Sequence, residues 1–170
     1  MKLYRTLITL LLSVIIPITT TAEQPYIPSQ LEHFEKTGTC VGCDLSEANL
    51  AWSKHNDANL SQALLVKIAL NYAAFNSANF SHAQIMYANL RDLQASGSNF
   101  SSADLTGSDL SYANLSSANL IEASFTNANL ANADLARAFV TEKQLAAAKS
   151  LSCAIMPDGT RHAADDGRSC

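Results

Sequence analysis

An apolar side chain recurs at every fifth position of the chain from Leu45 to Val140. Of the twenty positions in this register, eighteen are Leu, Phe, Ile or Val, and the exceptions are His55 and Ala95. The residue two positions earlier is Ala in fourteen of the twenty quintets, and the residue between them is Asn or Asp in twelve. Because the register runs without an insertion, residues 41–140 form one array of internal repeats.

A period of five fits neither regular backbone element. On an α-helix, five residues advance by about 500°, so successive apolar residues would spread around the whole cylinder. In a flat strand, an odd period places successive apolar residues on opposite faces. A short extended segment followed by a corner avoids both problems, because the small and the apolar residue then point the same way. The pattern therefore predicts an all-β solenoid in which each coil contacts its neighbours.

The tandem quintets, for example Ala-Asn-Leu-Ser-Ser at residues 113–117, resemble those of the pentapeptide-repeat family. The resemblance covers residues 41–140 and implies a right-handed quadrilateral β-helix with four quintets per coil, so that twenty quintets make about five coils. Two large residues, Ile68 and Leu93, occupy positions that are normally small. Leu93 lies two positions before Ala95, so a large and a small residue exchange sites, which conserves the interior volume.

A coil of four quintets places residues twenty positions apart on top of one another. We expect four outward asparagines to stack as an amide ladder of the kind that stabilises stacked β-structures; they are Asn59, Asn79, Asn99 and Asn119. Glu47 lies one coil below Lys67, and an exposed ion pair of this kind contributes under about 1 kcal/mol.

Outward aromatic side chains supply the candidate interaction patch. Trp52, Tyr72 and Tyr112 fall in one column, which Asp92 interrupts, and Tyr87 lies on the adjoining face. Aromatic residues are enriched at protein interfaces and among the residues that dominate binding energy. Stacking between coils, which stabilises the sheet, explains the column at least equally well.

Short α-helices are predicted at both ends of the array, where an open solenoid would expose strand edges. In the N-terminal segment, residues 23–40, Ser29 and Glu32 form a capping box. Gly38 suits the end of a helix, so we expect a capping helix over residues 30–37.

The C-terminal segment, residues 141–170, begins with a second capping box, Thr141 and Gln144. This motif predicts a capping helix from Glu142 to about Ser150. Pro-Asp-Gly at residues 157–159 then marks a turn, and a polar tail tethered by a disulfide follows.

Residues 1–22 have the layout of a secretory signal peptide. Lys2 and Arg5 precede an apolar run at residues 7–16, and small residues lead to a cleavage point after Ala22. The run is about half of the roughly 20 residues that a membrane-spanning helix needs. We therefore expect an exported protein, periplasmic or secreted, that has no membrane attachment after cleavage.

Composition narrows the classes of partner. The chain has 170 residues, of which 48% are hydrophobic and 15% charged, and its formal net charge is −4. Removal of residues 1–22 leaves 9 basic and 15 acidic residues, a net charge of −6. An acidic chain offers no electrostatic basis for binding nucleic acid, so no nucleic-acid partner is expected.

Four cysteines follow the signal peptide, and an even number in an exported chain indicates disulfides. Of three connectivities we favour Cys40–Cys43 with Cys153–Cys170, because the ends of five coils are about 24 Å apart and a disulfide needs Cα atoms within roughly 7 Å. A flexible tail could also bring Cys170 back to the first pair. A redox motif at Cys40 and Cys43 normally needs a strand-to-helix context, and zinc needs more ligands than the pair supplies.

Catalytic chemistry finds little support in the sequence. The chain has no Gly-rich phosphate loop, no metal-binding histidine pair and no nucleophile elbow. His55 occupies a core position beside Lys54 and Asp57, where it is either a buried proton switch or a polar residue of an imperfect first coil. No partner nucleophile is visible, which favours the second explanation. We expect a non-enzymatic protein without a cofactor or metal.

Two hypotheses of function remain. The first is a structural or protein-interaction scaffold for an unidentified protein partner, a monomer or weak homodimer because both ends carry helices. The second is a DNA-mimic inhibitor of a DNA-binding enzyme such as gyrase, as some members of the family are. Residues 41–140 carry eight acidic and four basic residues, a net charge of −4. Duplex DNA of about 24 Å carries roughly 14 negative charges, so this deficit and the signal peptide disfavour the second hypothesis.

Overall fold

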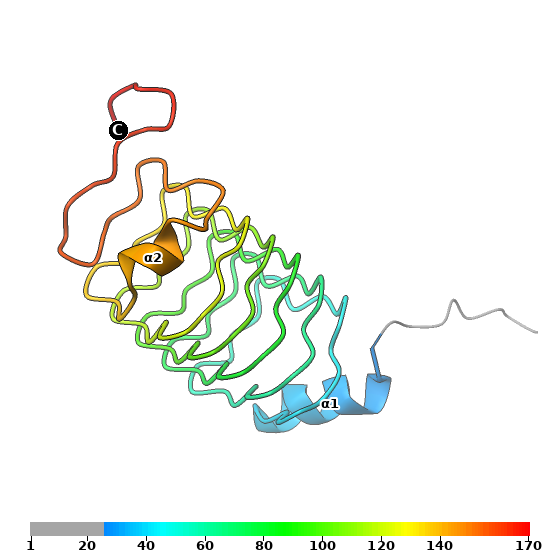
Figure 1. Ribbon diagram of the computed structural model, residues 1–170. Coiled ribbons are helices and arrows are strands. Elements are labelled where there is room, and N and C mark those ends of the chain that lie inside the picture. The colour runs from blue at the N-terminus through cyan, green and yellow to red at the C-terminus, as the bar shows by residue number, and fades with distance from the viewer. Residues whose placement is uncertain (1–25) are drawn as a thin grey trace, which may run out of the picture.

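The computed structural model describes residues 26–170, in which the chain winds into a stack of coils (Figure 1). Parallel backbone pairing joins residues twenty positions apart. The pairs run from Thr39 with Asn59 to Asn119 with Phe139, and each involves the residue before a central quintet position. Because four quintets make twenty residues, each coil has four sides. Each side pairs with the next coil through one residue, so the described residues contain no longer strand. The predicted signal peptide, residues 1–22, lies outside the described residues.

Every quintet ends in a tight turn. In most, the backbone N–H of the small residue donates to the apolar residue's carbonyl three positions earlier, as Ser53 does to Leu50 at 3.2 Å. The third turn residue has a positive φ, between 55° and 69°, at all twenty corners from Gly42 to Arg137. The second keeps a negative φ, so these are type II turns. Seventeen corner residues are not glycine, and a left-handed conformation costs roughly 1–2 kcal/mol for each, which contacts between coils must offset.

The outward Asn and Asp residues serve these turns. In all twelve quintets that have Asn or Asp before the central residue, its Oδ1 accepts the backbone N–H two residues later, at 2.9–3.3 Å. The expected amide ladder is therefore wrong as a general feature of Asn59, Asn79, Asn99 and Asn119. Their backbones stack, but only the Asn99 amide reaches a neighbour, Asn79 Oδ1 at 3.4 Å. The reason is proximity, because each Oδ1 finds a donor within its own turn.

Where a quintet lacks Asn or Asp, the coil below can supply the acceptor. Ala74 and Gln94 precede two such central positions. There, Asn56 Oδ1 accepts the backbone N–H of Asn76 at 3.0 Å, and Asn76 Oδ1 accepts that of Ser96 at 3.0 Å. A ladder thus exists, but on the turn residue that follows the central position.

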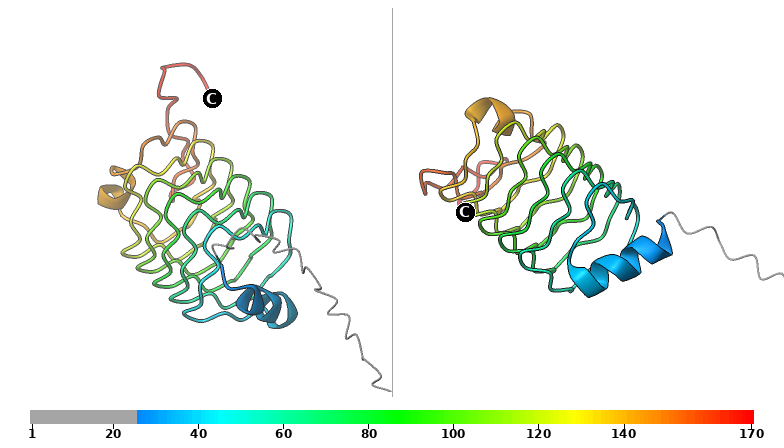
Figure 2. Two further views of the ribbon diagram at one scale, coloured as in Figure 1. Left: turned by 90° about the vertical axis from the view of Figure 1, so that its right-hand side faces the viewer. Right: turned by 90° about the horizontal axis from the view of Figure 1, so that it is seen from below.

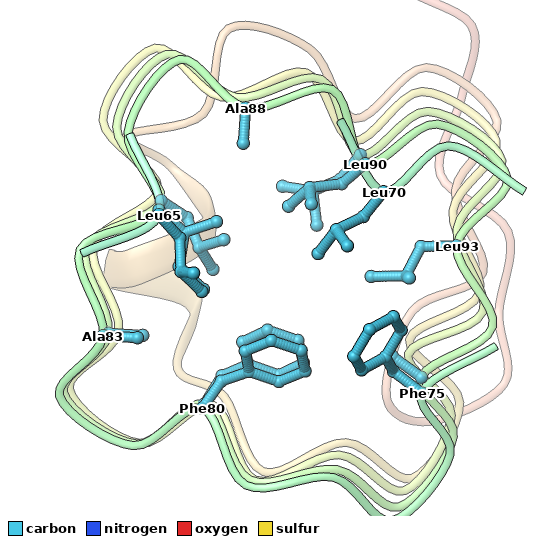
Figure 3. Packing of buried hydrophobic residues seen from close by; sticks show 14 of the residues in the cluster. Leu65, Leu70, Phe75, Phe80, Ala83, Ala88, Leu90 and Leu93 are labelled. Atoms are coloured by element: carbon cyan, nitrogen blue, oxygen red, sulfur yellow. The ribbon is translucent and has the colours of Figure 1, made fainter. Parts of the chain in front are cut away.

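The interior is a column of apolar side chains that enter from all four sides (Figure 3). Leu65, Leu70, Phe75 and Phe80 are fully buried, and their quintets form successive sides of one coil. Leu93 and Ala95 are also both fully buried, as the exchange of a large and a small residue predicts.

Two inward serines of the array are satisfied by backbone carbonyls of the coil below. The hydroxyl of Ser98 donates to the carbonyl of Phe75 at 2.7 Å, and that of Ser108 donates to Ile85 at 2.5 Å. Within residues 26–170, no buried side-chain nitrogen or oxygen lacks a hydrogen-bond partner. The interior therefore carries little cost of desolvated polar groups.

Helix α1, Pro28–Thr37, lies against the first coils (Figure 2). The N-cap residue is Ile27, and no side chain caps the helix, so the predicted start at residue 30 and the capping role of Ser29 are wrong. Proline is favoured at the first helical position because its missing N–H has no partner there in any case. The helix ends where the sequence places its end: Gly38 has a φ of 69°, and its N–H donates to Phe34 at 2.7 Å.

Side chains of α1 and its flank contact the first coil. Phe34 is fully buried, and its ring lies 4.6 Å from that of His55. Gln30 Oε1 accepts the backbone N–H of Asp44 at 2.7 Å, and Thr37 Oγ1 accepts that of Thr39 at 3.2 Å. Two sides of the first coil thus have their edge donors satisfied.

Helix α2, Glu142–Leu145, lies at the opposite end of the stack (Figure 1). Thr141 and Gln144 form the predicted capping box, but the predicted continuation to about Ser150 is wrong. The N–H of Lys149 donates to Ala128 at 2.7 Å, and Ser150 pairs in parallel with Asn129. Pairing with an open strand edge prevails over the helix propensity of the three alanines after Leu145.

The chain after α2 continues the stack, displaced by one residue. Ser150 pairs with Asn129 and Ile155 with Asp134, a separation of 21 residues in place of twenty. Ile155 also pairs antiparallel with Arg161, after the turn at residues 157–159. The segment expected to be a helix and a polar tail therefore contributes two further sides to the stack. Of the helices within residues 26–170, none has the length and apolar character that crossing a bilayer requires.

Leu64 and Leu65 allow the same substitution to be made on the two faces of one wall. Leu65 is fully buried, whereas Leu64 occupies the outward position and keeps partial exposure. We expect Leu65→Ala to lower the free energy of unfolding by about 2–5 kcal/mol, through lost burial and a cavity. Leu64→Ala should cost less than half as much. Urea unfolding followed by circular dichroism measures both, and equal losses would contradict the inward register.

Candidate functional site

The predicted aromatic column forms a continuous outward stack. The rings of Trp52 and Tyr72 lie 4.2 Å apart at an interplanar angle of 14°. The guanidinium carbon of Arg91 lies 4.6 Å from the centre of the Tyr112 ring. All four side chains stand at one corner of the stack, and Trp52 is 70% exposed. We call Trp52, Tyr72, Arg91 and Tyr112 the corner column.

Arg91 closes the gap that Asp92 leaves in the aromatic register. Its Nε lies 3.3 Å from Asp92 Oδ2, and its Nη1 donates to Ser111 Oγ at 3.4 Å. The neighbouring Tyr72 side chain, and then the negative charge of Asp92, raise the pKa of Arg91 above its already high value. Sequence reasoning missed Arg91, although its position directly before Asp92 was a usable signal. A guanidinium over an aromatic face replaces the missing ring.

Tyr87 stands apart from the corner column. It is 63% exposed, and it lies at the corner directly before that of Asp92 along the chain, where its ring covers Gly107 one coil above. A Cβ atom at Gly107 would lie 2.7 Å from Tyr87 Cδ1, so glycine leaves the space in which the ring lies. The structure thus joins three of the four predicted patch residues with Arg91 and leaves Tyr87 on the far side of the same wall.

The wall between these two corners is lined by small and polar side chains. Its outward residues before each central position are Asn49, Ala69, Asn89, Asp109 and Asn129. Such a surface is flat, and the column forms a raised aromatic edge along it. This combination suits contact with another macromolecule better than enclosure of a small ligand, which normally occupies a concave pocket.

The four cysteines pair within each end of the chain. Cys40 and Cys43 are joined with Cα atoms 5.5 Å apart, and Cys153 and Cys170 are joined with Cα atoms 5.4 Å apart. This is the connectivity that the sequence favours, and no cysteine among residues 26–170 is free. Cys40 and Cys43 lie in the interior at the start of the first coil, and no helix follows them. The second bridge closes the C-terminal loop.

His55 has a structural environment. Its ring lies between Phe34 and Phe75, with centroids 4.6 Å and 5.4 Å away. Burial lowers the pKa of His55 from 6.5, and the negative charge of Glu35 partly opposes this shift. Among the hydrogen bonds of residues 26–170, none involves the His55 ring. These residues also contain no group of three or more His, Cys, Asp or Glu side chains that could hold a metal ion.

Comparison with known proteins bears on the fold. A protein-family model described as "Pentapeptide repeats (8 copies)" matches three overlapping segments of the chain, residues 43–67, 65–101 and 98–137. No curated protein sequence matches the chain.

Two solved structures illustrate the likeness. The first is a pentapeptide repeat protein from the thylakoid lumen of Arabidopsis thaliana, with 25% identity and a TM-score of 0.58 over 63% of this chain and 72% of that one. The second is the pentapeptide repeat protein Rfr23 from the cyanobacterium Cyanothece 51142, with 25% identity and a TM-score of 0.41 over 62% of this chain and 92% of that one.

Gly97 and Gly107 form a matched pair for testing whether the Tyr87 ring needs a glycine beneath it. Both are corner residues, with φ values of 68° and 69°, but a Cβ atom at Gly97 would meet only Ser77 Oγ at 3.9 Å. Alanine costs left-handed strain at both positions, and at Gly107 it also displaces a ring. We expect Gly107→Ala to lower the free energy of unfolding by about 1 kcal/mol more than Gly97→Ala. Adding Tyr87→Ser should remove this difference in urea unfolding, and a difference that survives would exclude the ring as its cause.

The environment of His55 predicts acid sensitivity. Because the folded-state pKa lies below 6.5, the unfolded chain binds the proton more tightly, and stability is lost as pH falls through this value. The urea midpoint should therefore drop between about pH 7.5 and pH 5, and His55→Leu should reduce the drop. His82→Gln, at an exposed corner, is the control and should keep the wild-type profile. An unchanged profile for His55→Leu would assign the acid sensitivity elsewhere.

Proposed function

Since the chain belongs to the pentapeptide-repeat family, we propose that it is an exported, non-enzymatic scaffold that binds a protein partner through the corner column and the wall beside it. In this proposal the mature protein is a rod of about five coils, with α1 packed against one end and with α2 and residues 149–161 over most of the other. Covered ends disfavour filaments of stacked copies, so the scaffold acts as a monomer or weak homodimer.

The exposure of the corner column is the observation that carries this proposal. Stacking between coils explains why Tyr72 lies against Trp52, but it leaves Trp52 70% exposed at the edge of a flat wall. Tyr112 is also 48% exposed. Burial of large aromatic side chains at an interface contributes strongly to binding, and arginine and aromatic residues dominate such contacts. A partner that covers the wall would gain this apolar area.

Export is supported by the cysteines and by one relative. Both disulfides lie within residues 26–170, and disulfides persist in oxidising compartments. The similar protein from Arabidopsis thaliana comes from the thylakoid lumen. These observations agree with the signal-peptide layout of residues 1–22 and favour a periplasmic or secreted scaffold.

Replacement of the column tests the binding surface. We expect Trp52→Ser with Tyr72→Ser to abolish recovery of a partner when the processed protein is crosslinked and pulled down from its own compartment. Tyr87→Ser removes an exposed ring from the adjacent corner, at the far edge of the same wall, and is the matched control, which should retain the partner. Melting temperatures are measured in parallel. If the double variant melts earlier but recovers the same partner, the column only stabilises the stack and the proposed surface is wrong.

A further inference from the structure

At the end of the stack that carries α2, two of the four sides are fully paired and a third is partly covered. Gln144 Nε2 donates to the carbonyls of Leu120 and Ala123, at 2.7 Å and 3.0 Å, and so occupies the acceptor of one side, while the N–H of Phe125 on that side has no partner among the hydrogen bonds of residues 26–170. Ser150 covers the second through its pairing with Asn129, and Ile155 covers the third through its pairing with Asp134. The antiparallel pairing of Ile155 with Arg161 closes this third side in turn.

The fourth side, residues 138–140, ends in a free strand edge. In the coil below, Ala118 accepts the N–H of Phe139 at 2.9 Å, and Leu120 donates to Phe139 at 3.0 Å. The equivalent groups one coil higher are the carbonyl of Ala138 and the N–H of Val140. Among the hydrogen bonds of residues 26–170, neither group has a partner. We call residues 138–140 the free edge; it offers one acceptor and one donor, spaced to receive a single added residue.

Apolar side chains border the free edge. Phe139 occupies a position that is Asn or Asp in twelve of the twenty quintets, and it is 62% exposed. Ile121, from the coil below, is 52% exposed. With Val140, Thr141 and Gln144 they line an open hollow of about 590 Å³. An apolar strand edge is a ready template for another chain, whereas the exposed Lys54 protects an edge at the other end of the stack.

Acidic side chains stand beside the hollow. Glu122 lines it, and Glu142 lines the neighbouring surface next to Val140. Glu122 accepts a hydrogen bond from Ser102 Oγ at 2.9 Å, and within the described residues it forms no ion pair with a lysine or arginine. A basic side chain on an occupant would therefore meet an uncompensated carboxylate.

We propose that the free edge binds an extended peptide segment of a partner protein by β-strand addition. One peptide residue donates its N–H to the carbonyl of Ala138 and accepts the N–H of Val140, as each bridging residue does within the stack. Its outward apolar side chain packs on Phe139, its neighbours turn inward over Val140, and a following lysine or arginine pairs with Glu122. Backbone pairing supplies affinity in this mode and the side chains supply specificity. This site lies beyond the corner column and does not depend on it.

The test uses the processed full chain and a defined probe, the fluorescein-labelled peptide Ser-Val-Ile-Val-Lys-Lys, followed by fluorescence anisotropy. We expect saturable binding that weakens at least about tenfold, or about 1.4 kcal/mol, with Phe139→Asn, which restores the residue type common at this position. Val140→Pro removes the donor without breaking any intramolecular hydrogen bond and should weaken binding equally. N-methylation of the peptide's isoleucine should do the same, and Glu122→Gln should reduce the advantage over a peptide with Glu in place of Lys.

The controls distinguish this proposal from the proposed binding of a partner by the corner column. Trp52→Ser with Tyr72→Ser should bind the peptide as the wild type does, so loss of the partner there and loss of the peptide here are independent results. The proposal is overturned if the wild-type protein does not bind the peptide. It is also overturned if Phe139→Asn and Val140→Pro both bind the peptide as tightly as the wild type does. If Val140→Pro fails to fold, Phe139→Asn and the N-methylated peptide still decide. Sedimentation that shows a dimer abolished by Phe139→Asn, with no peptide binding, would assign the edge to a second copy and also overturn the proposal.

Discussion

The left-handed corner is the constraint on which the rest of the structure depends. Every corner residue from Gly42 to Arg137 has a positive φ, and this turn directs the chain from one side of the coil to the next. The N–H of the corner residue donates to a carbonyl of the following coil, as Trp52 does to Asn71 at 3.1 Å. A coil therefore cannot hold its shape alone, because each corner is stabilised by the coil above, and stability is shared between neighbouring layers.

The surface that we propose as functional follows from this constraint. A corner places its side chain outward, directly beneath the residue twenty positions later, so large residues at corners must stack or remain exposed. Trp52 and Tyr72 stack, Arg91 fills the gap before Tyr112, and Tyr87 lies over the glycine at position 107. Aromatic contacts of this kind contribute about 0.5–1.5 kcal/mol beyond burial, which offsets part of the strain of the corners. The same rings remain accessible to a partner.

The repeat array was predictable because a period of five has one solution that buries every central side chain. The inward register and the exchange of Leu93 with Ala95 followed from spacing, whereas the outward column of Trp52 and Tyr72 also needed the coil of four quintets that the family resemblance implies. The helix ends were less predictable, because Ser29 satisfies a capping rule that Ile27 and its following proline override. Sequence reasoning also missed Arg91. It placed in the column only residues twenty positions apart, and it did not consider that a long side chain at the position before Asp92 reaches the same column.

Spacing by itself determined a solenoid and its buried positions, because these depend on local geometry repeated many times. The four sides were implied by the resemblance to the pentapeptide-repeat family, and the structure decided between the possible cysteine pairings. Only the tertiary structure decided where the array stops. The alanines after Leu145 favour a helix locally. The helix nevertheless ends, because Ser150 pairs with the open strand edge at Asn129. The free groups of Ala138 and Val140 likewise arise because the chain leaves one side to form α2. Whether a strand edge is covered depends on contacts between segments distant in sequence, and a local sequence pattern does not predict these contacts.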